Sequence, residues 1–300
     1  MIGVFSRGRL GNQMFQLAFA HVAAKKLNTS YFIFRSNALH YFECHRNLGF
    51  LNGMWIFIFM LRNIFRRSSH TFRYGGMRKL WSELLNVLAS KSVVAWPNQV
   101  GGDKYLWTNF RDNMMCDGFF QSADYFLGNE MEVRSLFKVK EEFRLIFEKE
   151  KADLLERPYV AVHLRRTDYI DFGGDEIGGY DMTLPAAYYH RCLAMIDNLQ
   201  SYKVVFVSDD MEFAKAEFGS SAQYSFERNN EITDFQILLN AKIVISANST
   251  FSWWAAWLNE RTDKIIFAPE YFLGFKVKKD YPAGIRVKDW KWINVGGENE

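Results

Sequence analysis

Four runs of consecutive apolar, largely β-branched residues constrain the fold of this chain more than any other feature. They recur through its second half at residues 159–164 (YVAVHL), 203–207 (KVVFV), 242–245 (KIVI) and 264–268 (KIIFA). Such continuous runs indicate strands of a parallel sheet that is covered on both faces. Helical segments alternate with them, at residues 186–199, 211–218, 234–240 behind a Thr233 cap, and 251–259. The pattern predicts a doubly wound α/β domain whose ligands bind where strand carboxyl ends meet helix amino ends.

The first half begins in the same style. A strand at residues 2–5 leads through a loop into a helix over about residues 12–27, and a second strand follows at 31–34. The charged run 141–157 (EEFRLIFEKEKADLLER), which precedes Pro158, predicts a solvated helix and the best domain boundary. We therefore expect two domains, residues 1–155 and 156–300. Residues 36–115 within the first domain show no clear pattern and are interpreted as mixed helix and loop.

Composition and charge exclude several classes of protein. A hydrophobic content of 49% over 300 residues predicts a folded protein with a large core, and a net charge of +3 is too small for a general nucleic-acid binder. The three cysteines, Cys44, Cys116 and Cys192, lie far apart with no CxxC pattern. This spacing argues against a disulfide framework or zinc knuckle and favours a reducing compartment.

Two segments bear on location. Residues 2–5 read as a buried strand with no signal-peptide pattern ahead of them, which predicts a cytoplasmic protein. The apolar stretch 50–65 contains Asn52 and Arg62 and falls short of the roughly 20 residues that span a bilayer. A core helix is the favoured interpretation. A surface helix in peripheral contact with the inner face of the membrane stays open, because Arg66 and Arg67 beside it would attract anionic lipid.

The first candidate site lies at residues 163–169 (HLRRTDY), where a predicted buried strand ends. If strand alternation persists, His163 and Arg165 point together into the crevice and Arg166 points the other way. A guanidinium suits a diphosphate and an imidazole suits a nucleobase or ribose edge. The alternative is that Arg166 pairs with Asp168 in a surface turn and His163 is a satisfied core histidine.

The second candidate site, residues 246–254 (SANSTFSWW), runs from a strand into a helix. Ser249 or Thr250 can cap this helix, and its free N–H groups form an anion site together with the helix dipole. The alternative is a capped, buried helix. We favour that alternative for the tryptophans, as core residues, and leave it open for Asn248, Ser249 and Thr250.

Acidic residues follow the predicted strand 203–207. Asp209 or Asp210 could accept hydrogen bonds from a ribose or a guanine edge. A metal role is disfavoured because adjacent aspartates point differently and no D-x-D spacing occurs in the chain. The alternative for Asp210 is a helix N-cap.

A glycine-rich loop at residues 8–14 (GRLGNQM) joins the first strand to the first helix. It lacks the three-glycine dinucleotide fingerprint, so alone it is a weak signal. Its position would face the second domain's site across a cleft.

Five stretches together resemble the bacterial α1,2-fucosyltransferases, glycosyltransferase family 11. They are residues 8–16 (GRLGNQMFQ), 118–126 (GFFQSADYF), 163–169, 207–210 (VSDD) and 248–259 (NSTFSWWAAWLN), in order across nearly the whole chain. Departures from the family pattern are Leu10, Thr167 and Ala255, at positions where glycine is usual.

The resemblance implies two Rossmann-like domains facing across a cleft, the GT-B fold. It further implies an inverting, metal-independent enzyme that moves L-fucose from GDP-β-L-fucose to the 2-hydroxyl of a β-galactosyl acceptor in surface glycan synthesis. Its partners would be GDP-fucose and a galactose-terminated oligosaccharide or lipid-linked glycan, without cofactor or nucleic acid. The alternatives are a fucosyltransferase of another linkage, a transferase of another nucleotide sugar, and a non-catalytic nucleotide- or glycan-binding module.

The resemblance also assigns roles to residues. The catalytic group is Arg165, which would contact the diphosphate, with His163 and Asp168; Asp168 is a candidate base or orients Arg165. The donor-binding group is Arg166, Asp209, Asp210, Asn248, Ser249, Thr250 and Phe251. The acceptor side is Asn12 and Gln13, and no residue is assigned to a metal.

Overall fold

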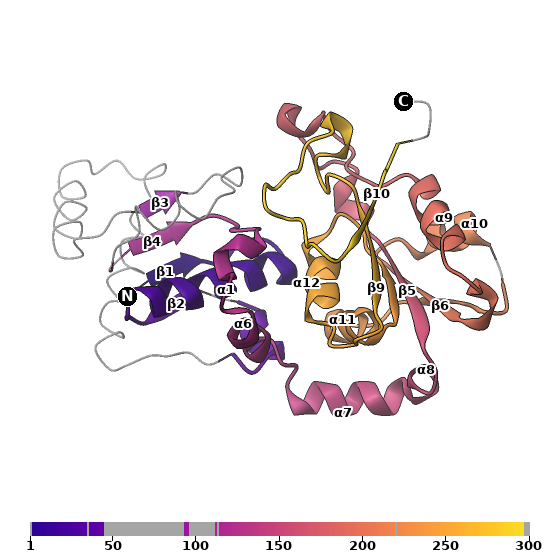
Figure 1. The fold of residues 1–300 in the computed structure, drawn as a ribbon, viewed down its shortest axis with the longest axis horizontal. Helices are drawn as coiled ribbons and strands as arrows, with labels where there is room; N and C mark the ends of the chain where they lie inside the picture. The colour runs from indigo at the N-terminus through magenta and orange to yellow at the C-terminus, as the bar shows by residue number, and fades with distance from the viewer. Residues whose placement is uncertain are drawn as a thin grey trace, which may run out of the picture.

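The computed structural model describes residues 2–34, 36–44, 93–95, 112, 114–219 and 221–296 and places two parallel sheets beside each other (Figure 1). The first sheet has the order β2-β1-β4-β3. Its strands are β1 (Ile2–Phe5), β2 (Tyr31–Phe34), β3 (Val93–Ala95) and β4 (Met114–Asp117). The second sheet has the order β10-β9-β8-β5-β6-β7. Its strands are β5 (Tyr159–Leu164), β6 (Lys203–Ser208), β7 (Tyr224–Glu227), β8 (Ile243–Ile245), β9 (Ile265–Pro269) and β10 (Lys291–Ile293).

Helices connect and cover these strands. The α-helices are α1 (Leu10–Lys26), α2 (Ala38–Tyr41), α6 (Glu130–Leu136), α7 (Glu141–Glu150), α8 (Ala152–Leu155), α9 (Ala186–Ala194), α10 (Met211–Phe218), α11 (Glu231–Asn240) and α12 (Thr250–Leu258). Short 3-10 turns are η2 (Ala123–Phe126), η3 (Thr167–Tyr169), η4 (Asp175–Ile177), η5 (Leu199–Ser201) and η6 (Phe275–Val277).

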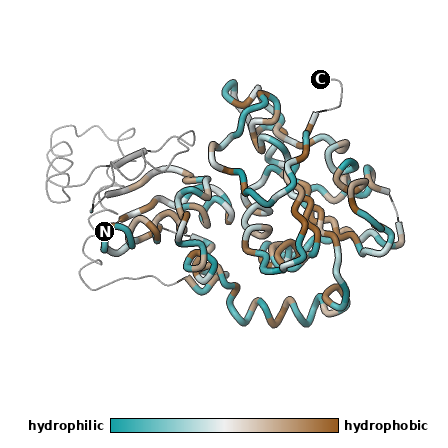
Figure 2. The backbone as a smooth tube through the Cα atoms, in the orientation of Figure 1, coloured by the Kyte–Doolittle hydropathy of each residue, from teal (hydrophilic) through white to brown (hydrophobic). Residues whose placement is uncertain are grey.

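The four strands predicted in the second half are confirmed to within one residue. Both faces of β5 are buried: Ala161 belongs to the core shared with the first sheet, while Val160 and Val162 face the core under α9. The apolar centre of this sheet is visible in Figure 2. In this sheet the sequence analysis missed β7 and β10, because each lies at an edge of the sheet and lacks a continuous apolar run. In the first sheet it missed β3 and β4.

The predicted start of α11 is wrong by three residues. The side chain of Asn230, not Thr233, caps this helix by accepting a hydrogen bond of 2.9 Å from the backbone N–H of Thr233. Asparagine is a strong N-cap residue, and capping from Asn230 brings Glu231 into the first turn. The acidic start of α11 thus becomes part of a helix rather than a loop.

The contact between α1 and α12 joins the two halves. A Cβ atom on Gly11 would lie 2.4 Å from the carbonyl carbon of Thr250, so only glycine allows this approach. One turn further, the Phe15 ring packs 4.7 Å from Trp253 and 4.8 Å from Trp254, measured between ring centroids. Both tryptophans are fully buried, which confirms that they are core residues. A continuous core therefore runs from the first sheet into the second.

The charged run after α6 forms the connection between the halves, at the bottom of Figure 1. It is divided into α7 and α8 at Lys151 instead of forming one helix. Within α7 only Phe147 is buried, so the helix is solvated as predicted. The domain boundary expected after residue 155 falls between α8 and β5 and stays a prediction.

Residues 50–67, where we expected a core or membrane-surface helix, lie outside the described part of the chain. Among the helices that are described, none has the length and apolar character needed to cross a bilayer.

We expect Gly11→Ala to lower the free energy of unfolding by about 1–3 kcal/mol, the usual cost of overpacking. The added methyl group would meet backbone atoms of Thr250 and Phe251 at 2.4–2.6 Å, which cannot move without separating the two helices. Urea-induced unfolding measures the change. Gly296→Ala is the control, because its methyl group would meet only a side-chain oxygen at 3.5 Å. Equal stability of the two variants would contradict the close approach.

Candidate functional site

A cavity of about 490 Å³ lies between the two halves. The N-terminal half contributes the loop before α1 and the segment after β4, including Arg9, Asn12 and Gln121. The C-terminal half contributes the carboxyl ends of β5 and β6 and the starts of α11 and α12. This is the place where an open parallel sheet binds its ligands, as the sequence predicted.

Arg165 is the central cation of this cleft. Its guanidinium contacts Asp168 (Nη2 to Oδ1, 2.6 Å) and Asp209 (Nη1 to Oδ2, 3.1 Å), and its side chain is 13% exposed. Burial acts to raise the pKa of Asp209, but a hydrogen bond from Thr167 and the charge of Arg165 outweigh it, so this pKa lies below its usual range. Two carboxylates thus hold the guanidinium in one position at the cleft wall.

His163 lies beside Arg165 in the cleft, so the predicted shared face of the two residues is confirmed. Its Nδ1 has no hydrogen-bond partner in the part of the chain that the structure describes. It is therefore not the satisfied core histidine of the alternative interpretation. Burial, followed by the charge of Arg165, lowers the pKa of His163 to about 3. The imidazole is consequently neutral at physiological pH.

Arg166 turns away from the cleft, as strand alternation predicted. Its backbone N–H donates to Asp209 Oδ1 at 2.9 Å, and its guanidinium lies 3.5 Å from the ring centroid of Phe213. Its Nε contacts Asp210 at 3.4 Å, so the alternative pairing with Asp168 is not formed. Asp210 also caps α10 by accepting from the Phe213 N–H at 3.1 Å. Neither Arg166 nor Asp210 lines the cavity.

The start of α12 meets the N-terminal half at Asn12. The Ser249 side chain caps the helix by accepting from the Phe251 N–H at 3.4 Å. Asn12 Oδ1 accepts two hydrogen bonds, one from Thr250 Oγ1 at 2.9 Å and one from Gln121 Nε2 at 2.7 Å. All five of these residues line the cavity: Asn12, Gln121, Ser249, Thr250 and Phe251. Asn12 is therefore fixed by both halves at the junction.

Two predicted site residues lie behind the wall. Asn248 is fully buried. Its Nδ2 donates to the backbone carbonyl of Met182 at 2.8 Å, and its backbone carbonyl accepts from the Tyr169 hydroxyl at 3.1 Å. Gln13 holds the neighbouring loop: its Nε2 donates to the Gly8 carbonyl at 3.0 Å and its Oε1 accepts from the Asn37 N–H at 2.6 Å. Neither of them lines the cavity.

Sequence analysis missed the acidic start of α11, although both of its carboxylates line the cleft. Burial raises the pKa of Glu231, against the charges of Arg9 and Arg165, and raises the pKa of Asp234 to about 6. The signal was a pair of acidic residues one turn apart after a strand, and the misplaced helix start concealed it. Arg9 and Gln121 were overlooked within motifs that had been noticed.

Within the described ranges, no three His, Cys, Asp or Glu side chains come together as metal ligands do.

Solved structures share this architecture at low sequence identity. The fucosyltransferase NodZ from Bradyrhizobium matches with a TM-score of 0.50 and 13% identity, over 85% of this chain and 92% of that one. A variant of Arabidopsis thaliana FUT1 in complex with GDP also matches with a TM-score of 0.50, at 10% identity, over 89% of this chain and 69% of that one. The GT-B fold, two Rossmann-like domains facing across a cleft, is thereby confirmed.

Curated relatives and a family model give the same assignment. The O-antigen biosynthesis glycosyltransferase WbnK from Escherichia coli is 27% identical over 89% of this chain and 93% of its own length. An α1,2-colitosyltransferase from Escherichia coli is 33% identical over 51% of this chain and 53% of its own length. The family model described as Glycosyl transferase family 11 matches residues 1–294. This match covers nearly the whole chain and both walls of the cleft, and the chain belongs to glycosyl transferase family 11.

Proposed function

We propose that this glycosyltransferase moves L-fucose from GDP-β-L-fucose to the 2-hydroxyl of a β-galactosyl acceptor, with inversion, in surface glycan synthesis. The observation that carries the proposal is Arg165, a cation held by two carboxylates in a cleft that also contains a helix start. The relatives support the finer points, because one is named for O-antigen biosynthesis and another for an α1,2 linkage.

Departure of GDP builds negative charge on the β-phosphate, and the cleft offers two groups that stabilise it. Arg165 presents a guanidinium that is already fixed, so little reorganisation is needed as the charge develops. The start of α12 adds the positive end of a nine-residue helix, whose Phe251 N–H is capped by Ser249. Charge stabilisation of this kind can take the place of a metal ion.

The nucleoside would lie against the C-terminal half. Both oxygens of Asp209 already accept hydrogen bonds or ion pairs, from Arg165, the Arg166 N–H and Thr167. We therefore assign Asp209 to positioning Arg165, and assign the recognition of guanine or ribose hydrogens to Glu231. The neighbouring Asp234 already accepts a hydrogen bond of 2.9 Å from Asn229 Nδ2. Carboxylates at this edge of the sheet accept hydrogen bonds from nucleosides in related folds.

The acceptor would enter from the N-terminal half. Asn12 is held at the junction and we assign it to the acceptor hydroxyl, with Gln13 acting through the shape of the loop. Asp168 lies 2.6 Å from Arg165 and 3.6 Å from Arg9, and a carboxylate that holds two cations is better suited to orienting them than to accepting a proton. Residues 1–155 and 156–300 would thus serve the acceptor and the donor.

The function is tested by incubation with GDP-fucose and a panel of galactose-terminated acceptors, followed by linkage analysis. We expect an α1,2-linked fucosyl product, formed equally well in EDTA. GDP-mannose and UDP-galactose, offered in parallel, should be inert. A different linkage, or GDP binding without any transfer, would support one of the alternatives instead. Because one relative is named for colitosyl transfer, an α1,2 linkage with a nucleotide-activated colitose as donor is the second candidate.

We expect Arg165→Ala to lower turnover by more than about 100-fold, because one charge partner of the transition state is lost. Arg165→Lys keeps the charge but not the planar guanidinium, and its turnover should lie between that of Arg165→Ala and that of the wild type. Steady-state transfer from GDP-fucose measures both. Lys215→Ala, an exposed residue of α10, is the matched control for loss of a cation. Near-normal turnover of Arg165→Ala would exclude its assigned role.

The pH dependence of kcat/KM tests whether His163 transfers a proton, and we expect that it does not. Since its pKa lies near 3 and below the unfolded value, folding favours the neutral imidazole, which becomes protonated only in strong acid. We expect His163→Asn to weaken GDP binding by up to about tenfold, the scale of one hydrogen bond. The inflections of the kcat/KM profile between pH 5 and 8 should stay where they are. Disappearance of an inflection in this variant would show that His163 titrates during catalysis.

A further inference from the structure

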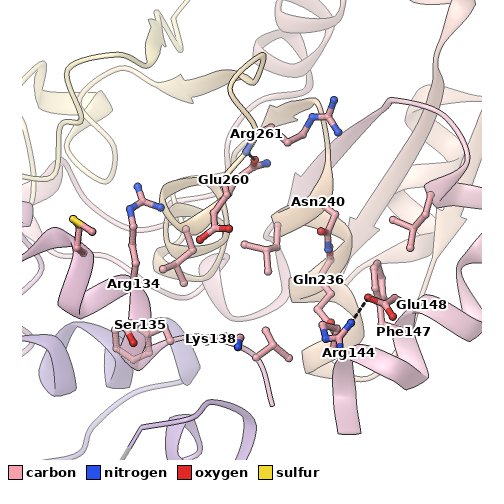
Figure 3. Close-up of a pocket in the computed structure, with 17 residues that line it drawn as sticks. Arg134, Ser135, Lys138, Arg144, Phe147, Glu148, Gln236, Asn240, Glu260 and Arg261 are labelled. Carbon is pink, nitrogen blue, oxygen red and sulfur yellow. Dashed lines mark hydrogen bonds and ion pairs between the residues drawn. The ribbon is translucent and has the colours of Figure 1, made fainter. Parts of the chain in front are cut away.

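A second cavity of about 750 Å³ lies at the opposite ends of α11 and α12 from the cleft (Figure 3). The cleft is lined by the first turns of these helices, whereas this cavity is lined by their last turns, at Asn240 and Leu258. The nine residues of α12 rise by about 13 Å. The two cavities are therefore separate, and the second is not used by the proposed donor or acceptor.

One part of the cavity lining is apolar. Its floor consists of the buried side chains Phe137, Phe147 and Leu258. Its rim carries Met131, which is 86% exposed, and Leu155, which is also exposed. An apolar floor under an apolar rim is suited to a short hydrocarbon chain, because burying such a chain removes apolar surface from water on both sides.

Four cations and two carboxylates line the cavity. The cations are Arg134, Lys138, Arg144 and Arg261, and the carboxylates are Glu148 and Glu260. Arg144 is paired with Glu148 at 2.7 Å, and Arg261 is paired with Asp263 at 3.0 Å. Neither Arg134 nor Lys138 makes an ion pair with a carboxylate anywhere in the described chain. Two cations of one wall are therefore left to an outside partner.

Arg134 is held in position without being neutralised. Its guanidinium carbon lies 4.2 Å from the ring centroid of Trp257, and stacking of this kind leaves the N–H edge free for an anion. Burial lowers its pKa, and the nearby charges of Glu260 and Glu130 offset this only in part. Figure 3 shows Arg134 and Lys138 on one side of the cavity, together with Glu260, and Gln236 and Asn240 on the other. A partly desolvated cation that makes no ion pair with a described carboxylate favours an anionic ligand.

We propose that this cavity binds a small amphipathic anion, with its charged head on Arg134 and Lys138 and its alkyl chain on the apolar floor. The volume lies within the range of about 300–1,000 Å³ that is usual for small-molecule sites. An alkyl chain joined to an anionic head distinguishes this ligand from the nucleotide sugar and from the galactosyl end of the acceptor.

Isothermal titration calorimetry with octyl phosphate, below its micelle concentration and in saturating GDP, tests the proposal. We expect one molecule to bind per chain, and GDP to leave its affinity unchanged. Octyl glucoside, which lacks the charge, should bind at least about tenfold more weakly, on the scale of one charged hydrogen bond. Inorganic phosphate, which lacks the chain, should also bind at least about tenfold more weakly, because no apolar surface is buried. No binding, equal binding of octyl glucoside, or displacement by GDP would each overturn it.

Variants locate the site. Arg134→Gln and Lys138→Gln should each weaken octyl phosphate binding by about tenfold or more, and Arg165→Ala should not. Lys149→Gln is the control, an exposed lysine of α7 that does not line the cavity. Arg134→Gln could fail to fold because the guanidinium no longer stacks on Trp257. Lys138→Gln then tests the head-group position, since Lys138 is exposed and its replacement leaves the core intact. Unchanged affinity in Lys138→Gln would contradict the assigned head-group position.

Discussion

The approach of α1 to α12 is the contact on which the rest of the structure depends. The absence of a side chain at Gly11 lets the backbone of Thr250 lie against α1, and the Phe15 ring then packs against two buried tryptophans. Each helix begins at the cleft, so the same contact brings the glycine-rich loop of one half to the capped helix start of the other. Asn12 joins them directly, by accepting hydrogen bonds from Thr250 and Gln121.

The charges of the cleft are arranged so that one cation is fixed and its neighbour is neutral. Arg165 is held by Asp168 and Asp209, and the nearby His163 stays uncharged because burial and the same arginine oppose its protonation. A neutral imidazole adds no charge repulsion next to the guanidinium, and in the proposed function Arg165 is the group that meets the diphosphate. The family assignment explains why a polar network of this kind lies in a cleft between two Rossmann-like domains.

The helices α11 and α12 line both cavities. Their first turns line the cleft, with Glu231 and Asp234 from α11 and Thr250 and Phe251 from α12, and their last turns line the second cavity. That cavity also borders α6 and α7, in the segment that connects the two halves. A ligand there would contact both the connecting segment and the helices that carry the donor-side groups, without touching the donor itself.

The sequence by itself determined the elements that carry a local or periodic signal. The continuous apolar runs located β5, β6, β8 and β9, because a strand buried on both faces needs apolar residues throughout, and strand alternation placed His163 and Arg165 on one face. Only the tertiary structure decided which polar groups face the cleft. Asp209 is occupied by Arg165, Asp210 caps α10, and Asn248 and Gln13 bond backbone groups behind the wall, whereas Glu231 and Asp234 reach the cavity. A polar side chain binds whichever partner folding brings within reach, and those partners lie up to 238 residues away along the chain, as between Asn12 and Thr250.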